Sequence, residues 1–273
     1  MQDLRGRNAI VTGASRGIGV HIARALASEG LNLVLVARSA EQLAGVAEEV
    51  RHQGGRVVDV VGDVTVAADR VAMVAEAERC LGQVDILVNN AAIIEWSRFE
   101  KEEPADIDRI IETNLSAPLH LTGMVLPGML ERRSGHIVNV SSLAGKIGIP
   151  YEATYAASKG GLLQWATSLR GELEGTGVGV SSILPSYVTD VGQAADHGVV
   201  VPRLAGAVSP AAVAAAVVKA LRSDAPEIIV RSMPTRPLLA LGELVPGLGA
   251  RVMKSMGLVS LHRRLADRHE RSF

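Results

Sequence analysis

The 273-residue sequence has one cysteine, almost no net charge and no long apolar segment. Cys80 has no second cysteine with which to form an internal disulfide, which favours a reducing compartment and predicts a cytoplasmic protein. The formal net charge of −1 gives no overall field that would attract nucleic acid or an acidic lipid surface. The longest stretch without Asp, Glu, Lys or Arg, residues 113–130, contains prolines and polar residues and predicts a buried helix rather than a membrane span. We also expect no secretion signal, because the N-terminal segment is charged, and no metal site.

Hydrophobic residues make up 48% of the chain and charged residues 21%, which excludes an intrinsically disordered protein. Short apolar, β-branched runs alternate with longer segments of helical composition, and this alternation predicts a single doubly wound α/β domain with a seven-stranded parallel sheet and helices on both faces. The expected strands are residues 8–12, 31–36, 56–61, 84–89, 136–140, 178–184 and 227–230. The expected helices are residues 17–29, 40–52, 67–81, 107–132, 155–174 and 209–223.

Ligands in such sheets bind at the carboxyl ends of the strands, so the residues that follow each strand are the candidate site. The first strand leads into a glycine-rich turn, Thr12-Gly-Ala-Ser-Arg-Gly-Ile-Gly19, and then into a helix. Glycines let backbone amides approach a pyrophosphate, and the helix N-terminus favours negative charge. A tight strand-to-helix loop without a ligand is the simpler alternative, although the position between a strand and a helix supports dinucleotide binding.

The second strand ends at Ala37-Arg38-Ser39 without the acidic residue that binds the ribose 2′-hydroxyl of NAD. Arg38 instead offers a planar fork suited to a phosphate, and Arg16 in the glycine-rich turn is placed to meet the same group. This pattern predicts a preference for NADP(H) over NAD(H), the alternative being two solvated arginines. Asp63 follows the third strand, where it would accept a hydrogen bond from the adenine amino group or cap the next helix.

The fifth strand ends in Ser141-Ser142, and Tyr155 and Lys159 follow at a spacing that puts them on one face of a helix. A phenol is a poor base near neutral pH, and a neighbouring ammonium would favour its ionised form. Tyr-x-x-x-Lys alone often describes a solvent-facing pair. Its position after a strand that ends in two serines, with Asn114 in the preceding helix, favours a catalytic role.

Taken together, these elements resemble the short-chain dehydrogenase/reductase family over about residues 5 to 230. The resemblance rests on Thr12–Gly19, Asn89-Asn90-Ala91-Ala92, Asn114, Ser142, Tyr155 and Lys159. It implies that Tyr155 is the acid or base for hydride transfer, that Ser142 binds the substrate oxygen, that Lys159 binds the nicotinamide ribose and lowers the Tyr155 pKa, and that Asn114 anchors a relay water. The implied cofactor-binding residues are Gly13, Ser15, Arg16, Gly17, Ile18, Gly19, Arg38, Asp63, Val64, Asn90, Ala91, Tyr155, Lys159, Pro185 and Val188.

The sequence departs from the family pattern at several positions. Ala92 and Ser186 stand where glycine is usual, and Thr189 lies one position early for its usual cofactor contact. The last strand lacks the glycine pair that often follows it in tetrameric members; a homodimer or a homotetramer is expected. The variable loops, residues 93–96, 143–151 and 187–208, are mostly apolar, which predicts a hydrophobic ketone or aldehyde and its alcohol as substrates. Alternatives are a dinucleotide-binding sensor or scaffold without turnover, and an epimerase or dehydratase that retains its cofactor.

Residues 1–230 are expected to form the catalytic domain, and residues 231–273 an extension of that domain. The extension carries eight Lys or Arg against three acidic residues, interspersed with apolar side chains. A basic amphipathic segment can lie on a membrane surface. A helical flap over the substrate cleft, or a contact with a partner subunit, is the interpretation that we favour for this segment.

Overall fold

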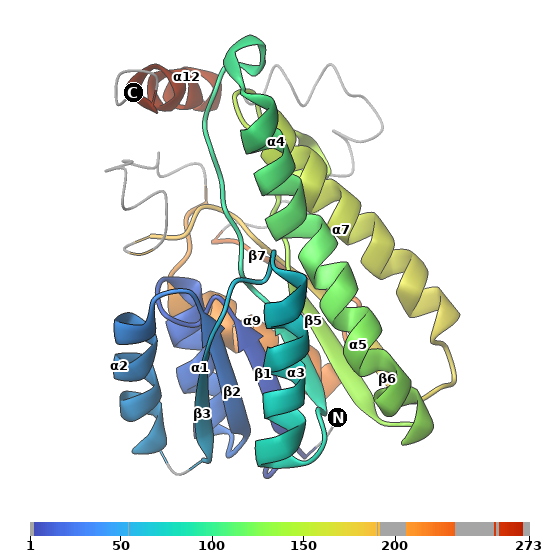
Figure 1. The fold of residues 1–273 in the computed structure, drawn as a ribbon. Coiled ribbons are helices and arrows are strands. Elements are labelled where there is room, and N and C mark those ends of the chain that lie inside the picture. The colour runs from blue at the N-terminus through green and yellow to red at the C-terminus, as the bar shows by residue number, and fades with distance from the viewer. Residues whose placement is uncertain are drawn as a thin grey trace.

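A computed structural model describes residues 3–53, 55–189, 191, 206–232, 254 and 257–269. Seven parallel strands form one sheet in the order β3-β2-β1-β4-β5-β6-β7 (Figure 1). The order reverses between β1 and β4, which makes this a doubly wound α/β sheet, as the alternating pattern predicts. The strands are β1 (Asn8–Thr12), β2 (Asn32–Ala37), β3 (Val57–Val61), β4 (Ile86–Asn89), β5 (Gly135–Val140), β6 (Val178–Pro185) and β7 (Glu227–Val230).

The helices cover both faces of the sheet, and each face has its own apolar core (Figure 1). The first core packs side chains of α1 (Ile18–Ser28), α2 (Ala40–Arg51) and α9 (Pro210–Ser223) against the sheet. The second packs α3 (Ala67–Leu81), α5 (Ala117–Glu131) and α7 (Ala153–Glu172) against the other face. Because both faces are covered, β1 and β5 are buried along their whole length.

The predicted helix over residues 107–132 is in fact three consecutive helical pieces. These are α4 (Pro104–Ile111), a π-helical turn over Glu112–Ser116, and α5. A π-turn widens the hydrogen-bonded ring by one residue, and such turns occur often at functional sites. The hydrophobic pattern does not reveal this turn, because the segment is helical on both sides of it.

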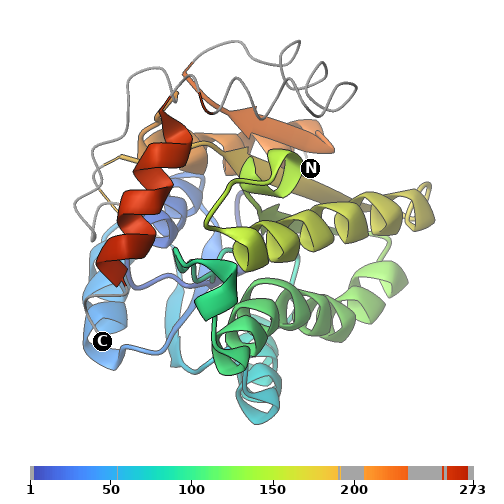
Figure 2. The same cartoon turned by 90° about the horizontal axis from the view of Figure 1, so that it is seen from above.

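Two short elements of the described chain were not assigned from the sequence, a 3-10 turn (Phe99–Lys101) and α6 (Ala144–Ile147). A third element, α12 (Leu258–His269), is a helix within the extension, for which a helical flap was expected without bounds. Helix α12 belongs to the C-terminal extension and lies apart from both helical layers, on the side where α4 and α7 begin (Figures 1 and 2). Residues 192–205 of the predicted substrate loop and residues 233–253 of the extension lie outside the described residues. No helix in the described ranges is both long and apolar enough to span a bilayer.

Candidate active site

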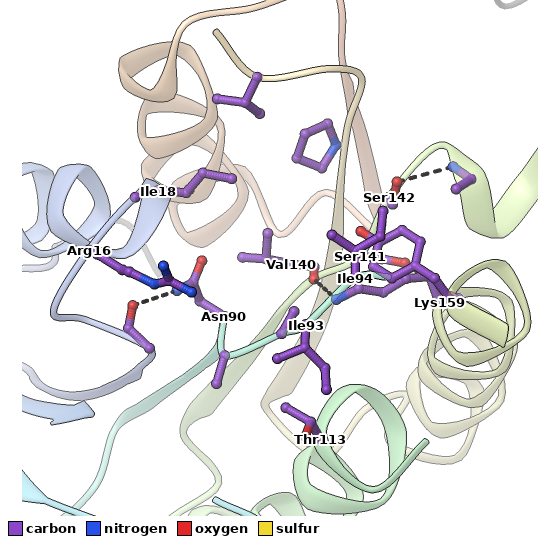
Figure 3. Close-up of a pocket in the computed structure, with 18 of the residues that line it drawn as sticks. Arg16, Ile18, Asn90, Ile93, Ile94, Thr113, Val140, Ser141, Ser142 and Lys159 are labelled. Carbon is purple, nitrogen blue, oxygen red and sulfur yellow. Dashed lines mark hydrogen bonds between the residues drawn. The ribbon is translucent and has the colours of Figure 1, made fainter. Parts of the chain in front are cut away.

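A cavity of about 550 Å³ follows the carboxyl edge of the sheet from the glycine-rich turn to Tyr155 and Lys159. The strand register places the ends of β1, β4, β5, β6 and β7 along this edge, so residues far apart in sequence meet there (Figure 3). Most of the predicted site residues line the cavity: Gly13, Ser15, Arg16, Gly17, Ile18, Arg38, Asp63, Val64, Asn90, Ala91, Ser142, Tyr155, Lys159, Pro185 and Val188. Gly19 and Asn114 do not line it.

The glycine-rich turn is held tightly against the end of β4. Gly13 and Gly17 have φ values of +67° and +62°, a region that favours glycine. A Cβ on Gly13 would lie 2.8 Å from the Cα of Ala91, and one on Gly19 would collide with the Gly13 carbonyl oxygen. Asn90 fixes the turn by donating from Nδ2 to the carbonyl oxygens of Thr12 (2.9 Å) and Gly13 (3.1 Å; Figure 3). Gly13 therefore allows the turn to lie against the residues after β4, and Gly19 allows α1 to begin beside the turn. The α1 N-terminus that results is a favourable place for a phosphate group.

Arg38 and Asp63 lie side by side at the end of the cavity next to β2 and β3, with Arg38 Nη1 3.6 Å from Asp63 Oδ2. Asp63 Oδ1 accepts hydrogen bonds from the amide (2.9 Å) and hydroxyl (2.8 Å) of Thr65. Burial opposes ionisation of Asp63, but these hydrogen bonds and the Arg38 charge outweigh it and hold the Asp63 pKa below its ordinary value. Helix α3 begins at Ala67 after Val66, so Asp63 is not its N-cap, and the capping alternative is wrong. The Arg38 side chain is 69% exposed, which leaves its fork accessible to a ligand.

Ser142, Tyr155 and Lys159 meet at the other end of the cavity. The Lys159 ammonium lies 5.8 Å from the centroid of the Tyr155 ring, as the i, i+4 spacing predicts. Its Nζ donates to the Val140 carbonyl oxygen at 2.9 Å (Figure 3). Burial and the charge of Glu152 raise the Tyr155 pKa, and a hydrogen bond with Ser142 only partly offsets them. The expected lowering of the Tyr155 pKa by Lys159 is therefore not found, because burial, followed by the Glu152 charge, sets the direction of the shift.

Asn114 lies in the π-helical turn and is fully buried behind the cavity wall. Its Oδ1 accepts from the Ile93 amide at 2.9 Å, and its Nδ2 donates to the Ile93 carbonyl oxygen at 2.8 Å. Nδ2 also lies 3.1 Å from the Ser158 hydroxyl. The Asn114 side chain thus holds the loop after β4 in place, and a relay-water role would have to involve other atoms of this residue.

Burial also lowers the pKa of Lys159 to about 8, which gives a test of the site by stability. The unfolded chain retains its lysine proton up to about pH 10.4, so between these pH values unfolding takes up a proton and wild-type stability rises with pH. Lys159→Met removes the buried charge, which destabilises the wild-type fold by about 3 kcal/mol below pH 8. It also removes the hydrogen bond to Val140, which stabilises the fold by about 1 kcal/mol. We expect urea unfolding to show the variant about 2 kcal/mol more stable than the wild type at pH 7, with this advantage lost by pH 10.5. An equal difference at both pH values would show that Lys159 is not a buried charge.

The structure shows where the three residues that depart from the family pattern, Ser186, Thr189 and Ala92, lie relative to the cavity. The Ser186 amide donates to the Val230 carbonyl oxygen at 3.0 Å, and its hydroxyl donates to the Gly206 carbonyl oxygen. The amide joins the ends of β6 and β7, as a glycine at this position also could, while the hydroxyl adds a bond to the segment before α9 that a glycine could not make. The Thr189 amide donates to the Val208 carbonyl oxygen, and Thr189 does not line the cavity. Ala92 lines it.

Sequence reasoning missed three residues around the substrate end: Glu152, Arg231 and His262. Arg231 lines the cavity directly after β7, so the rule of strand ends would have found it. Its Nε has no hydrogen-bond partner in the described part of the chain, and burial lowers its pKa. Glu152 precedes α7 and lines the same cavity. His262 lies in α12, where the sequence pattern indicates only a basic amphipathic segment.

Comparison with known proteins places this arrangement in a family. The model of the short chain dehydrogenase family matches residues 7–197. Relatives include "Ketoacyl reductase HetN" of Nostoc sp., 41% identical over 98% of this chain and 95% of its own, and "Dehydrogenase/reductase SDR family member 7B" of Bos taurus, 33% identical over 91% and 81%.

Two solved structures superpose on most of the chain. One is a metagenomic short-chain oxidoreductase in complex with NADP, with a TM-score of 0.73 and 35% identity over 85% of this chain and 100% of that one. The other is an actinorhodin polyketide ketoreductase variant with NADPH, with a TM-score of 0.77 and 31% identity over 85% and 98%. The predicted fold and family are confirmed: the chain belongs to the short-chain dehydrogenase family and is an oxidoreductase.

Proposed function

We propose that this protein is an NADP(H)-dependent ketoreductase, and that its substrate is a hydrophobic ketone of the 3-oxoacyl thioester class. The observation that carries the proposal is the single cavity that joins the glycine-rich turn and Arg38 at one end to Ser142, Tyr155 and Lys159 at the other. The names of the relatives, a ketoacyl reductase and a polyketide ketoreductase, support the 3-oxoacyl class.

The residues present divide the work of carbonyl reduction between them. The cofactor supplies the hydride when bound. Ser142 donates a hydrogen bond to the ketone oxygen and fixes its position. Tyr155, whose raised pKa keeps the phenol protonated near neutral pH, delivers the proton to that oxygen. Lys159, held by the Val140 carbonyl oxygen, keeps a positive charge next to the site and would donate to the ribose hydroxyls of a bound cofactor.

The cofactor preference follows from the end of β2. A carboxylate there would repel a 2′-phosphate, whereas Arg38 at this position, with Arg16 from the glycine-rich turn, supplies forked donors for one. Both arginines line the cavity. The two superposed structures carry NADP and NADPH, which agrees with this choice.

The substrate end of the cavity has an apolar wall beside the polar side chains of Glu152, Tyr187 and Arg231. The apolar wall is formed by the side chains of Ile93, Ile94, Trp96, Leu143, Ile147, Ile149 and Leu258. Such walls favour an acyl chain over a sugar or polyol. The extension takes part in this wall, because Leu258 begins α12, and Leu261 and Leu265 pack on Trp96. We therefore include residues 231–273 in the same domain as residues 1–230, with α12 as a cover on the substrate side.

The experiment is reduction of the N-acetylcysteamine thioester of 3-oxohexanoic acid, followed by loss of NADPH absorbance and by identification of the 3-hydroxy product. We expect turnover with NADPH and at least tenfold lower kcat/KM with NADH. Product formed with NADH alone would contradict the cofactor assignment. Binding of NADPH without reduction of this thioester or of simple hydrophobic ketones would favour the sensor or scaffold alternative.

A further inference from the structure

A buried polar cluster from four distant parts of the chain adjoins the catalytic end of the cavity. The Glu152 carboxylate, 4% exposed, accepts from Trp96 Nε1 at 2.7 Å, and its Oε1 also lies 3.0 Å from His262 Nε2. The Tyr187 hydroxyl lies 2.9 Å from the same His262 nitrogen. The Tyr187 and His262 rings stack with centroids 5.8 Å apart and an interplanar angle of 19°. His262 is fully buried, so α12 carries a polar side chain into the protein rather than toward solvent.

We assign the His262 tautomer from its contact with Glu152. A carboxylate oxygen 3.0 Å from Nε2 is repelled by a nitrogen lone pair and attracted by an N–H, so we place the hydrogen on Nε2. Nε2 then has no lone pair with which to accept a hydrogen bond from the Tyr187 hydroxyl. The Tyr187 oxygen can only accept from the Nε2–H group, which also faces Glu152. The hydroxyl hydrogen of Tyr187 is left without an acceptor in this cluster. Nδ1 of His262 has no hydrogen-bond partner among the described residues, so that atom serves no second contact there.

Tyr187 faces the same cavity as Tyr155. Tyr187, Tyr155 and Glu152 all line it. The Glu152 charge acts on both phenols, and with burial it raises the pKa of each, so both remain protonated near neutral pH. The cavity therefore contains two phenolic donors, and the mechanism described above uses only one.

We propose that Tyr187 is a substrate-binding residue that donates a hydrogen bond to a second oxygen of the substrate, and that His262 positions it. This inference rests on the proposed function. In a 3-oxoacyl thioester the second oxygen is the thioester carbonyl, two carbons from the ketone. Ser142 and Tyr155 hold the ketone oxygen while Tyr187 holds the thioester oxygen, which selects for a 1,3-dicarbonyl over a simple ketone. Helix α12 thus contributes to specificity through His262 as well as through its apolar side chains.

The test compares two substrates on three proteins. The substrates are the 3-oxohexanoyl N-acetylcysteamine thioester and a methyl ketone of matched chain length without the second carbonyl. The proteins are the wild type, Tyr187→Phe, which removes one oxygen and keeps the ring stack, and Tyr151→Phe as the control. Tyr151 also bonds α12, through its hydroxyl and Arg263 Nε at 2.8 Å, but on the exposed side.

We expect Tyr187→Phe to lower kcat/KM for the thioester about 5- to 10-fold, the effect of one hydrogen bond, and for the methyl ketone less than twofold. Tyr151→Phe should leave the ratio of kcat/KM for the thioester to kcat/KM for the methyl ketone unchanged. Equal losses on both substrates, or no loss on either, would overturn the inference. A wild type that reduces the methyl ketone but not the thioester would overturn it while leaving a ketoreductase. A wild type that reduces neither substrate would overturn the proposed function as well.

His262 is tested as a positioning residue with two variants. His262→Leu removes the donor to Glu152, and His262→Gln keeps an amide N–H that can replace Nε2. We expect the leucine variant to lose selectivity for the thioester and the glutamine variant to recover part of it, with KM changed more than kcat. If His262 had a purely structural role, its variants would lower kcat/KM equally for both substrates, and the loss would parallel the fall in thermal unfolding midpoint. That result would overturn the positioning assignment.

Discussion

Tyr155→Phe is expected to lower kcat for ketone reduction by about 10²- to 10⁴-fold, the contribution of a positioned proton donor. The variant retains the ring, which is half-buried against Lys159. It loses only the hydroxyl, which hydrogen-bonds Ser142 and which we propose as the proton donor to the ketone oxygen. The dissociation constant for NADPH should change less than about threefold, because the residues that hold the phosphates lie at the other end of the cavity. Steady-state reduction and calorimetric titration with NADPH measure the two quantities.

Tyr151→Phe is the matched control for this experiment. It removes a phenol that lies close in sequence and bonds Arg263 rather than the catalytic serine. We expect its turnover to stay within about twofold of wild type, as for a surface substitution. A Tyr155→Phe protein that keeps more than a tenth of wild-type turnover would show that another group supplies the proton. A protein that also loses NADPH affinity would show that the substitution disturbs the fold of the site.

The parallel sheet and most of the site were predictable because the strands and the positions of their ends follow from local patterns. Buried parallel strands appear as short apolar runs, and β1 and β7 were predicted with the bounds that the structure gives them. The residue after each strand then falls at the carboxyl edge whatever the crossovers look like. Gly13, Asp63 and Ser142 were found in this way, whereas Asn90 came only from the resemblance to the family. Arg231 obeys the same rule although it was overlooked.

The remaining features depend on contacts that no local pattern contains. His262 and Glu152 are 110 positions apart, and nothing in the apolar spacing of α12 indicates that one of its polar side chains is buried. The direction of the Tyr155 pKa shift also depends on contacts that form only in the folded chain. The i, i+4 spacing reveals the neighbouring lysine, but burial and Glu152 decide the outcome, and both are products of the folded chain. The π-turn at Asn114 lies inside a continuous helical pattern.

The second large effect concerns the cofactor: Arg16→Ser and Arg38→Ser should each weaken NADPH binding about 10- to 100-fold. That range is the value of one charge-assisted hydrogen bond to a phosphate. NADH has no 2′-phosphate, so its affinity should change little, and the double variant should bind the two cofactors almost equally. Calorimetric titration of each purified protein with NADPH and with NADH measures the ratio directly.

The strength of the Arg38–Asp63 ion pair affects how much NADPH affinity Arg38→Ser loses. At 3.6 Å between an arginine that is 69% exposed and a carboxylate that is 30% exposed, the pair is screened by solvent and worth less than about 1 kcal/mol. Arg38 can therefore leave Asp63 and bind a phosphate with little loss of free energy. Arg51→Ser is the control, because Arg51 pairs with Asp59 at 2.5 Å on β3 and does not line the cavity. If Arg38→Ser weakened NADPH and NADH equally, Arg38 would act through the adenosine pocket as a whole, and the 2′-phosphate preference would have to come from another residue.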